Sequence, residues 1–181
     1  MTAESLFEEF LEWSRKRLGY QALSPDEMQG IFLDPCAPHW VLSKVRQRQF
    51  GAFLHALSDL VPAESVLCLE GGSPDEEIRT FFENRRFEHP VQIEKGISWP
   101  KPECYHMPIT RENIEGLALL TERHAFPEIA IHIHVYHGEK SLLEWHDIFS
   151  RSFYASKDIP EERIREFCKV LGNKYRESDA S

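Results

Sequence analysis

The residues with the clearest chemical potential lie between 131 and 140, where the chain reads IHIHVYHGEK and holds three of its nine histidines. If this segment is a β-strand, alternate side chains share a face. His132, His134 and Tyr136 would then project together, and His137 would project oppositely. Two imidazoles on one strand face can converge on a metal ion, with Zn–N bonds of about 2.0–2.1 Å. Two ligands do not complete a site, so the others must come from a neighbouring strand.

The next segment, KSLLEWHDIF, is expected to be the hairpin partner, and the parity of the turn decides which side chains it presents. A turn with an even number of residues places Trp145 opposite His134. An odd turn, such as residues 138–140, places Glu144 there instead. We favour the odd turn because it gathers the apolar side chains of both strands on one face. The candidate metal ligands are then His132, His134, Glu144 and His146.

Two alternatives to a metal or acid–base site stay open. An ordinary antiparallel sheet with one wet face requires the same alternation and predicts the same polar set without any metal. The letters SLLE also match a capping box, so residues 142–150 could be helical, which would remove the cross-strand cluster.

A proline-rich stretch, SWPKPECYHMP, places Cys104 and His106 two residues apart. We expect an irregular loop here, because proline cannot donate to a central strand or continue a helix. A nucleophilic cysteine needs a base and an oxyanion donor, and neither can be placed from the sequence. The pattern therefore favours a binding loop over a catalytic one.

The elements that must position these residues follow from hydrophobic periodicity and capping signals. Helices are expected over residues 3–18, from Ser24, and over about 39–59, 73–87, 110–124 and 159–172. Strands are expected over residues 65–72, 91–99, 128–137, 140–149 and 153–156.

This order predicts an α/β fold, with α+β as the alternative: a mixed sheet of about four or five strands with a late antiparallel hairpin and helices packed on it. We expect a single globular domain over residues 1–175. It comprises a helical N-terminal part, residues 1–60, and an α/β part, residues 61–175, followed by a disordered tail over residues 176–181.

The composition of the chain disfavours several classes of binding partner. With 21 Lys and Arg against 30 Asp and Glu, the formal charge is −9, which disfavours nucleic acid and anionic membranes. The four cysteines form no CxxC pair, which argues against a zinc ribbon or finger. The N-terminus lacks the basic start and apolar run of a signal peptide, and no stretch has eighteen apolar residues. We expect a cytoplasmic protein.

No motif names a reaction, so the sequence favours a non-enzymatic, acidic protein that binds another protein, and the negative charge suits a basic partner. An immunity-like or antitoxin-like inhibitor is one form, and electrostatic steering would assist it. No cofactor is expected on this hypothesis. The alternatives are a small metal-dependent hydrolase that holds Zn²⁺ or another divalent metal on the histidine-rich strand face, and a small-molecule-binding sensor domain.

Overall fold

The computed structural model describes residues 31–34, 37–87, 103–149 and 151–178. The chain divides into two compact units, one of residues 1–30 and 91–101 and the other of residues 31–90 and 102–181. Every helix and strand given below belongs to the second unit. The helices expected over 3–18 and from Ser24, the strand expected over 91–99, and residues 179–181 of the expected tail lie outside the described residues.

The described residues form a seven-stranded sheet in the order β3-β2-β4-β5-β6-β1-β7, in which every neighbouring pair is antiparallel. The expectation of a mixed sheet with four or five strands was therefore wrong in strand number and in strand direction. The strands are β1 (His39–Leu42), β2 (Val66–Glu70), β3 (Cys104–Pro108), β4 (His132–His137), β5 (Lys140–Trp145), β6 (Phe153–Ser156) and β7 (Tyr175–Glu177).

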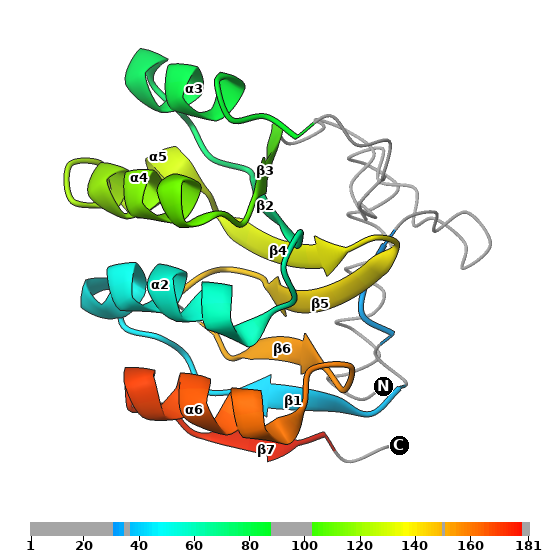
Figure 1. Cartoon of the computed structure of the whole chain (residues 1–181). Coiled ribbons are helices and arrows are strands. Elements are labelled where there is room, and N and C mark those ends of the chain that lie inside the picture. Colours follow the sequence, from blue (N-terminus) through cyan, green and yellow to red (C-terminus); the bar gives the residue numbers. More distant parts are fainter. Residues whose placement is uncertain (1–30, 35–36, 88–102, 150, 179–181) are drawn as a thin grey trace, which may run out of the picture. The chain divides into compact units, whose positions relative to one another are not determined.

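Five α-helices and one short 3-10 helix accompany the sheet in the described part of the chain. They are α2 (Phe50–Leu60), α3 (Glu76–Glu83), α4 (Arg111–Thr121), α5 (Phe126–Ile129) and α6 (Glu161–Leu171), with the 3-10 helix η2 over Gln47–Gln49. Figure 1 shows α2, α3, α4 and α6 on the same side of the sheet. The fold thus mixes helices with an antiparallel sheet that carries them on one face, which is the α+β arrangement given above as the alternative. No helix among the described residues is long and apolar enough to cross a membrane.

The main core lies between the helices and the sheet. Alternate residues of the central strands enter it, among them Leu67, Leu69, Ile133 and Val135. An aromatic cluster fills its middle, where Trp145 is fully buried and its ring centroid lies 5.1 Å from that of Phe53. The aromatic residues that contact these two rings are Phe50, Phe149, Phe153 and Phe167. Because side chains alternate along a strand, the residues between these core positions point to the opposite face.

The β4–β5 hairpin contains a β-bulge that sets its register. His137 pairs with Lys140 across a two-residue turn, but Val135 pairs with Leu143, so one extra residue stands in β5. That residue is Leu142, which is buried in the same core as Leu143. The expected odd turn was wrong, yet the bulge restores the favoured register, because His134 pairs with Glu144.

Two other expectations need correction. The helix expected over 39–59 is a strand over 39–42 and a helix that begins only at Phe50, because Trp40 and Leu42 alternate inward on the sheet. The expected loop around Cys104 is the edge strand β3, and its proline, Pro108, stands at the strand end, where a missing N–H is tolerated.

Smaller differences concern the ends of elements. The cap of α3 is Asp75, which accepts a hydrogen bond from the Ile78 N–H, and not Ser73. Arg176 and Glu177, expected in the tail, belong to β7 and pair with β1. Other boundaries were confirmed: Thr110 caps α4, and α6 ends at Gly172, which has a φ of +65°.

Candidate metal centre

A row of polar and sulfur-bearing side chains crosses the sheet on the face away from the main core. His106 of β3 pairs with Cys68 of β2, Cys68 pairs with His134 of β4, and His134 pairs with Glu144 of β5. Register partners in neighbouring strands share a face. The antiparallel order therefore places four chemically capable side chains next to one another, although they come from widely separated parts of the chain.

Three residues bring possible metal ligands together at one end of this row. His134, Glu144 and His146 each offer a ligand atom, and these three atoms lie within 4.8 Å of one another. His134 is only 5% exposed, and the Glu144 side chain is 12% exposed, whereas the His146 side chain is 50% exposed. The cluster is thus closed on the inner side and open beside His146.

Glu70, at the end of β2, holds the imidazole of His134. Its Oε2 lies 3.0 Å from His134 Nε2, and both side chains are buried. A carboxylate at this distance accepts a hydrogen bond from Nε2–H, so Nδ1 of neutral His134 carries no proton and keeps its lone pair. Metal-binding histidines commonly donate their second ring N–H to such a carboxylate, which fixes the ring orientation.

Glu144, the carboxylate of the cluster, is held by several hydrogen bonds. It accepts hydrogen bonds from the Leu33 backbone N–H and, at 3.1 Å, from the Ser141 hydroxyl, and its Oε2 lies 3.5 Å from His146 Nε2. Burial raises the pKa of Glu144, but these hydrogen bonds outweigh burial and leave the pKa lowered. The hydrogen bond with Glu144 in turn raises the pKa of His146. The pair therefore favours a carboxylate facing an imidazolium when no metal is bound.

His132 lies beside this cluster, but its Nδ1 already accepts a hydrogen bond from another residue. Its ring centroid is 5.5 Å from that of His146, and its Nδ1 accepts a hydrogen bond of 3.0 Å from the Asp147 N–H. Asp147 has a φ of +48°, a left-handed conformation that is uncommon outside glycine and turns this N–H toward the ring. A neutral imidazole with Nδ1 as acceptor carries its proton on Nε2. Burial also lowers the pKa of His132, so in this geometry neither ring nitrogen offers a free lone pair.

The structure thus brings together three of the four candidate ligands and sets His132 beside them. It also adds Glu70, which sequence reasoning did not include in the site. Strand alternation in VLCLE places Glu70 on the face of Cys68, but no local signal shows that β2 lies next to β4. That neighbour relationship is a long-range property of the fold.

The pair Cys104 and His106 does not form a site of its own. The two residues share a face of β3, and His106 Nδ1 lies 2.9 Å from the Tyr136 hydroxyl, while its Nε2 lies 4.0 Å from the Cys68 sulfur. Cys68 is completely buried. These contacts tie β3, β2 and β4 together next to the metal cluster.

No family model, curated protein or solved structure matches this chain. Inference about its function therefore depends on the geometry of its own residues.

Proposed function

We propose that this protein is a small metal-dependent hydrolase that holds a divalent metal ion through His134, Glu144 and His146. The observation that carries the proposal is the convergence of these three ligand atoms within 4.8 Å on one sheet face. Two histidines and a glutamate, with water in the fourth position, are one of the ligand sets of catalytic zinc sites. When bound there, the metal would lower the pKa of that water to about 7 and supply a nucleophile.

The spacing of the donors supports the proposal. Ligand atoms around a tetrahedral zinc ion lie about 3.3–3.5 Å apart, given bonds of about 2.0–2.1 Å. The limit of 4.8 Å in the metal-free cluster therefore requires an approach of at most about 1.5 Å. His146 is half-exposed, so its side chain is free to turn toward the ion, while His134 and Glu144 are held by Glu70, Leu33 and Ser141.

The charges of the site also suit a cation. Glu144 and Glu70 place two carboxylates within reach of His134, and the lowered pKa of Glu144 keeps that ligand ionised near neutral pH. Metal binding then requires only that His146 release its proton. The open side at His146 leaves room for water and for a substrate.

Metal content and binding test the proposal directly. Protein purified without a histidine tag should contain, or take up, about one Zn²⁺, Mn²⁺, Ni²⁺ or Fe²⁺ per chain, measured by mass spectrometry of the metal and by isothermal titration. A thermal shift on metal addition should accompany binding. His134→Ala and His146→Ala should each abolish uptake, whereas His55→Ala, on the exposed side of α2, should not change it. No uptake and no thermal shift would reject the metal site.

Hydrolysis is tested separately with chromogenic nitrophenyl esters of acetate and of phosphate. The metal-loaded protein should hydrolyse at least one ester class, and chelation or His146→Ala should abolish this activity. Turnover that persists after complete removal of the metal would contradict the proposed role of the ion. Metal binding without any turnover would leave a metal-binding protein and reject the hydrolase.

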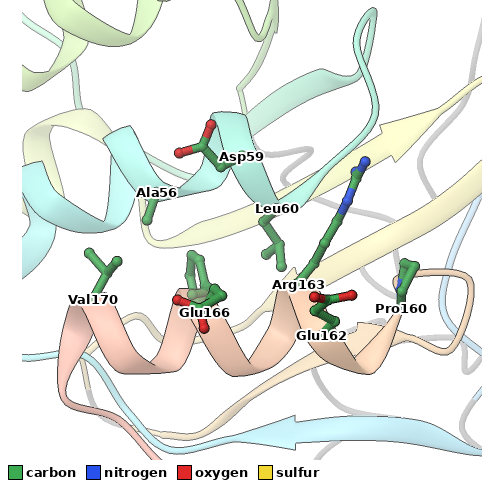
Figure 2. Close-up of a pocket in the computed structure, with 9 residues that line it drawn as sticks. Ala56, Asp59, Leu60, Pro160, Glu162, Arg163, Glu166 and Val170 are labelled. Carbon is green, nitrogen blue, oxygen red and sulfur yellow. The ribbon is translucent and has the colours of Figure 1, made fainter.

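A second candidate, the binding of a basic protein, is favoured by the surface between α2 and α6. Figure 2 shows a groove there with Asp59 and Leu60 on α2 and Glu162, Glu166 and Val170 on α6. Its volume is about 370 Å³, and its lining includes three carboxylates and a single guanidinium, that of Arg163. Val170 is 64% exposed. We propose that this groove accepts an amphipathic basic helix, whose apolar side would cover Val170 while its cations meet the acids.

A synthetic amphipathic helix of lysine and leucine is a suitable probe for the groove, with binding followed by fluorescence anisotropy. The double variant Asp59→Lys/Glu162→Lys should weaken binding at least tenfold, and added salt should slow association. The double variant Glu76→Lys/Glu112→Lys carries the same charge change on α3 and α4 and should bind as the wild type does, apart from a small general charge effect. Equal loss in both double variants would mean that net charge alone attracts the peptide.

A further inference from the structure

His132 carries a hydrogen-bond donor beside the open edge of the metal cluster. Its Nδ1 accepts a hydrogen bond of 3.0 Å from the Asp147 N–H, which keeps the ring proton on Nε2. Nε2 forms no hydrogen bond within the described structure and is not one of the buried unpaired atoms there, so solvent reaches it. An accessible N–H group that no protein group uses therefore lies next to the cluster.

The ring of His132 is close to the most exposed of the three ligands. Its centroid lies 5.5 Å from that of His146, which in turn lies 5.2 Å from that of His134. His146 thus contacts both of the other imidazoles, and half of its side chain is exposed. A molecule bound at the open side of the cluster, beside His146, therefore also lies beside His132.

The loop after β5 fixes this imidazole with an unusual backbone. Asp147 and Phe149 have φ angles of +48° and +67°, which are rare outside glycine. Between them, the Ile148 N–H donates a hydrogen bond of 3.1 Å to the Ile131 carbonyl, so the loop is tied to the residue before His132. Backbone held in such conformations occurs preferentially at ligand and active sites. The loop geometry is therefore consistent with a functional position for His132.

Two large apolar side chains flank the cluster on the side of Glu144. Tyr154 of β6 is the register partner of Glu144, so these two side chains share a face of the sheet. Phe32 precedes Leu33, whose N–H donates to the Glu144 carboxylate. Phe32 and Tyr154 are 40% and 39% exposed, and they are two of the five exposed large hydrophobic residues of the described structure. Open apolar surface thus lies beside a metal ligand.

The surroundings of the cluster do not suit an anionic substrate. Among the described residues, no lysine or arginine forms an ion pair or a hydrogen bond with the three metal ligands, with His132 or with Tyr154. Arg151 lies 3.7 Å from Asp147, but its side chain is 75% exposed. A charged group of the substrate would lose hydration against Phe32 and Tyr154 without gaining a cation, which costs free energy. An uncharged substrate with an apolar group fits better.

We propose that the substrates of this hydrolase are uncharged carboxylic esters with an apolar acyl chain, a proposal that rests on the hydrolase function itself. Tyr154 and Phe32 contact the acyl chain, and His132 Nε2–H donates a hydrogen bond to the ester carbonyl oxygen. This assignment combines the two features that the cluster has beside it, an unused N–H donor and open apolar surface.

The reaction is the addition of water to the carbonyl carbon. The water oxygen forms a bond with this carbon while the C=O electron pair moves onto the carbonyl oxygen. The C=O bond then re-forms, the ester C–O bond breaks, and the departing alkoxide takes the proton that water lost, which gives a carboxylic acid and an alcohol. The carbonyl oxygen is most negative between these two steps, so the hydrogen bond from His132 is strongest there.

Two esters of similar shape test the substrate class. 4-Nitrophenyl hexanoate is uncharged, whereas mono-4-nitrophenyl adipate ends in a carboxylate. After subtraction of the rate in buffer, the zinc-loaded wild type should have a kcat/KM at least tenfold higher for the hexanoate. Tyr154→Ala should raise KM for the hexanoate about fivefold with little change in kcat. Tyr154→Phe, which keeps the ring, should leave KM unchanged.

The role of His132 is tested by kcat. His132→Phe keeps an aromatic ring and removes the N–H, so kcat for the hexanoate should fall about 100-fold, with KM and the affinity for Zn²⁺ nearly unchanged. His132→Gln places an amide N–H at about the position of Nε2 and should recover at least tenfold of this loss. His55→Phe, the same change on the exposed side of α2, should have no effect. A merely structural role would change Zn²⁺ affinity together with kcat.

The outcomes separate this proposal from the hydrolase itself. Metal-dependent turnover with equal kcat/KM for the two esters would overturn the substrate class and leave the hydrolase standing. An unchanged kcat in a folded His132→Phe variant would overturn the role of His132. If that variant does not fold, His132→Asn decides, because its amide reaches the Asp147 N–H but not the substrate: full activity would overturn the role. No turnover of any ester would reject the hydrolase and its substrate class together.

Discussion

His134 and Glu70 face each other across β4 and β2, with 3.0 Å between Nε2 and Oε2, although 64 residues separate them in the chain. Because both side chains are buried, this hydrogen bond is shielded from water and holds the imidazole in one orientation. The same bond keeps the proton of neutral His134 on Nε2, and so leaves Nδ1 unprotonated, only if Glu70 stays ionised.

Replacing Glu70 with Gln should weaken metal binding about 10- to 100-fold, the usual cost of losing a carboxylate behind a metal-binding histidine. Isothermal titration with Zn²⁺ measures the effect. Glu139→Gln, in the exposed hairpin turn, removes the same charge and should bind the metal as the wild type does. Equal affinities for Glu70→Gln and the wild type would mean that Glu70 serves the fold alone.

The ion pair of Glu144 and His146 predicts how the metal-free protein responds to pH. The pKa of His146 is raised above 6.5, so its contribution to stability is complete below 6.5 and is lost as pH rises through the folded-state pKa. The pKa of Glu144 is lowered below 4.5, so its contribution is complete above 4.5 and is lost as pH falls through its folded-state pKa. The pair therefore stabilises the fold most between about 4.5 and 6.5.

Urea unfolding of the wild type and of His146→Gln across this range measures that contribution. The difference in midpoint should be largest near pH 5.5 and should shrink toward pH 9. A difference that stays constant from pH 5 to pH 9 would contradict the ionic interaction. The effect should be small because half of the His146 side chain is exposed.

The affinity for the metal should rise with pH, in contrast to the stability that the ion pair contributes. A metal competes with the proton of His146, so the apparent affinity should fall by up to about tenfold per unit below the raised pKa of this residue. Zn²⁺ titrations in two buffers of different ionisation heat would count the released protons. Binding without proton release near pH 7 would exclude His146 as a ligand.

Gly72 is a position where any side chain is expected to disturb the fold. A Cβ added there would lie 2.4 Å from the carbonyl oxygen of Ile129, a backbone atom that cannot move aside. We expect Gly72→Ala to lower the free energy of unfolding by about 1–3 kcal/mol, measured by chemical denaturation. Gly51→Ala is the matched control: its added Cβ meets nothing within 4 Å in helix α2, so it should stabilise by about 0.5–1 kcal/mol.

Phe53 stands at the centre of the aromatic cluster and is fully buried. Its ring contacts those of Trp145 at 5.1 Å and Phe153 at 5.9 Å. Phe53→Ala should therefore cost about 3–5 kcal/mol in unfolding free energy. Leu119→Ala, on the exposed side of α4, should cost less than about 0.5 kcal/mol. Similar losses in the two variants would mean that the cluster contributes little to stability.

Local signals in the sequence sufficed for much of the fold. The cap at Thr110, the stop at Gly172, the buried run at 66–70 and the alternation after Ile131 all correspond to elements of the structure. These signals depend on neighbours a few residues away. The first part of the helix expected over 39–59 was predicted wrongly because Val41, Leu42 and Val45 fit a helical period as well as a strand, and only pairing with β6 and β7 decides between them; the second part is confirmed as α2.

In the candidate site, too, some features follow from local sequence signals and others depend on long-range contacts. Alternation and the apolar pattern correctly placed Glu144 opposite His134. The hydrogen bond that commits His132 depends on the backbone angle of Asp147, and the contact with Glu70 depends on the order of strands in the sheet. Neither property is encoded in the spacing of residues along one segment.

The bulge at Leu142 keeps the polar side chains of β5 on one sheet face on both sides of the extra residue. Because Leu142 and Leu143 both enter the core, Ser141 and Glu144 return to the same face three residues apart, where they share a hydrogen bond. Losing Leu142 would leave a regular ladder in which His134 still pairs with Glu144, whereas one more residue inserted between Ser141 and Glu144 would shift the rest of β5 by one position against β4 and carry the carboxylate toward the core and the indole of Trp145 toward the histidines. Such an insertion would replace a candidate ligand with an aromatic ring in a single step, so β5 should tolerate the loss of Leu142 far better than the gain of a residue.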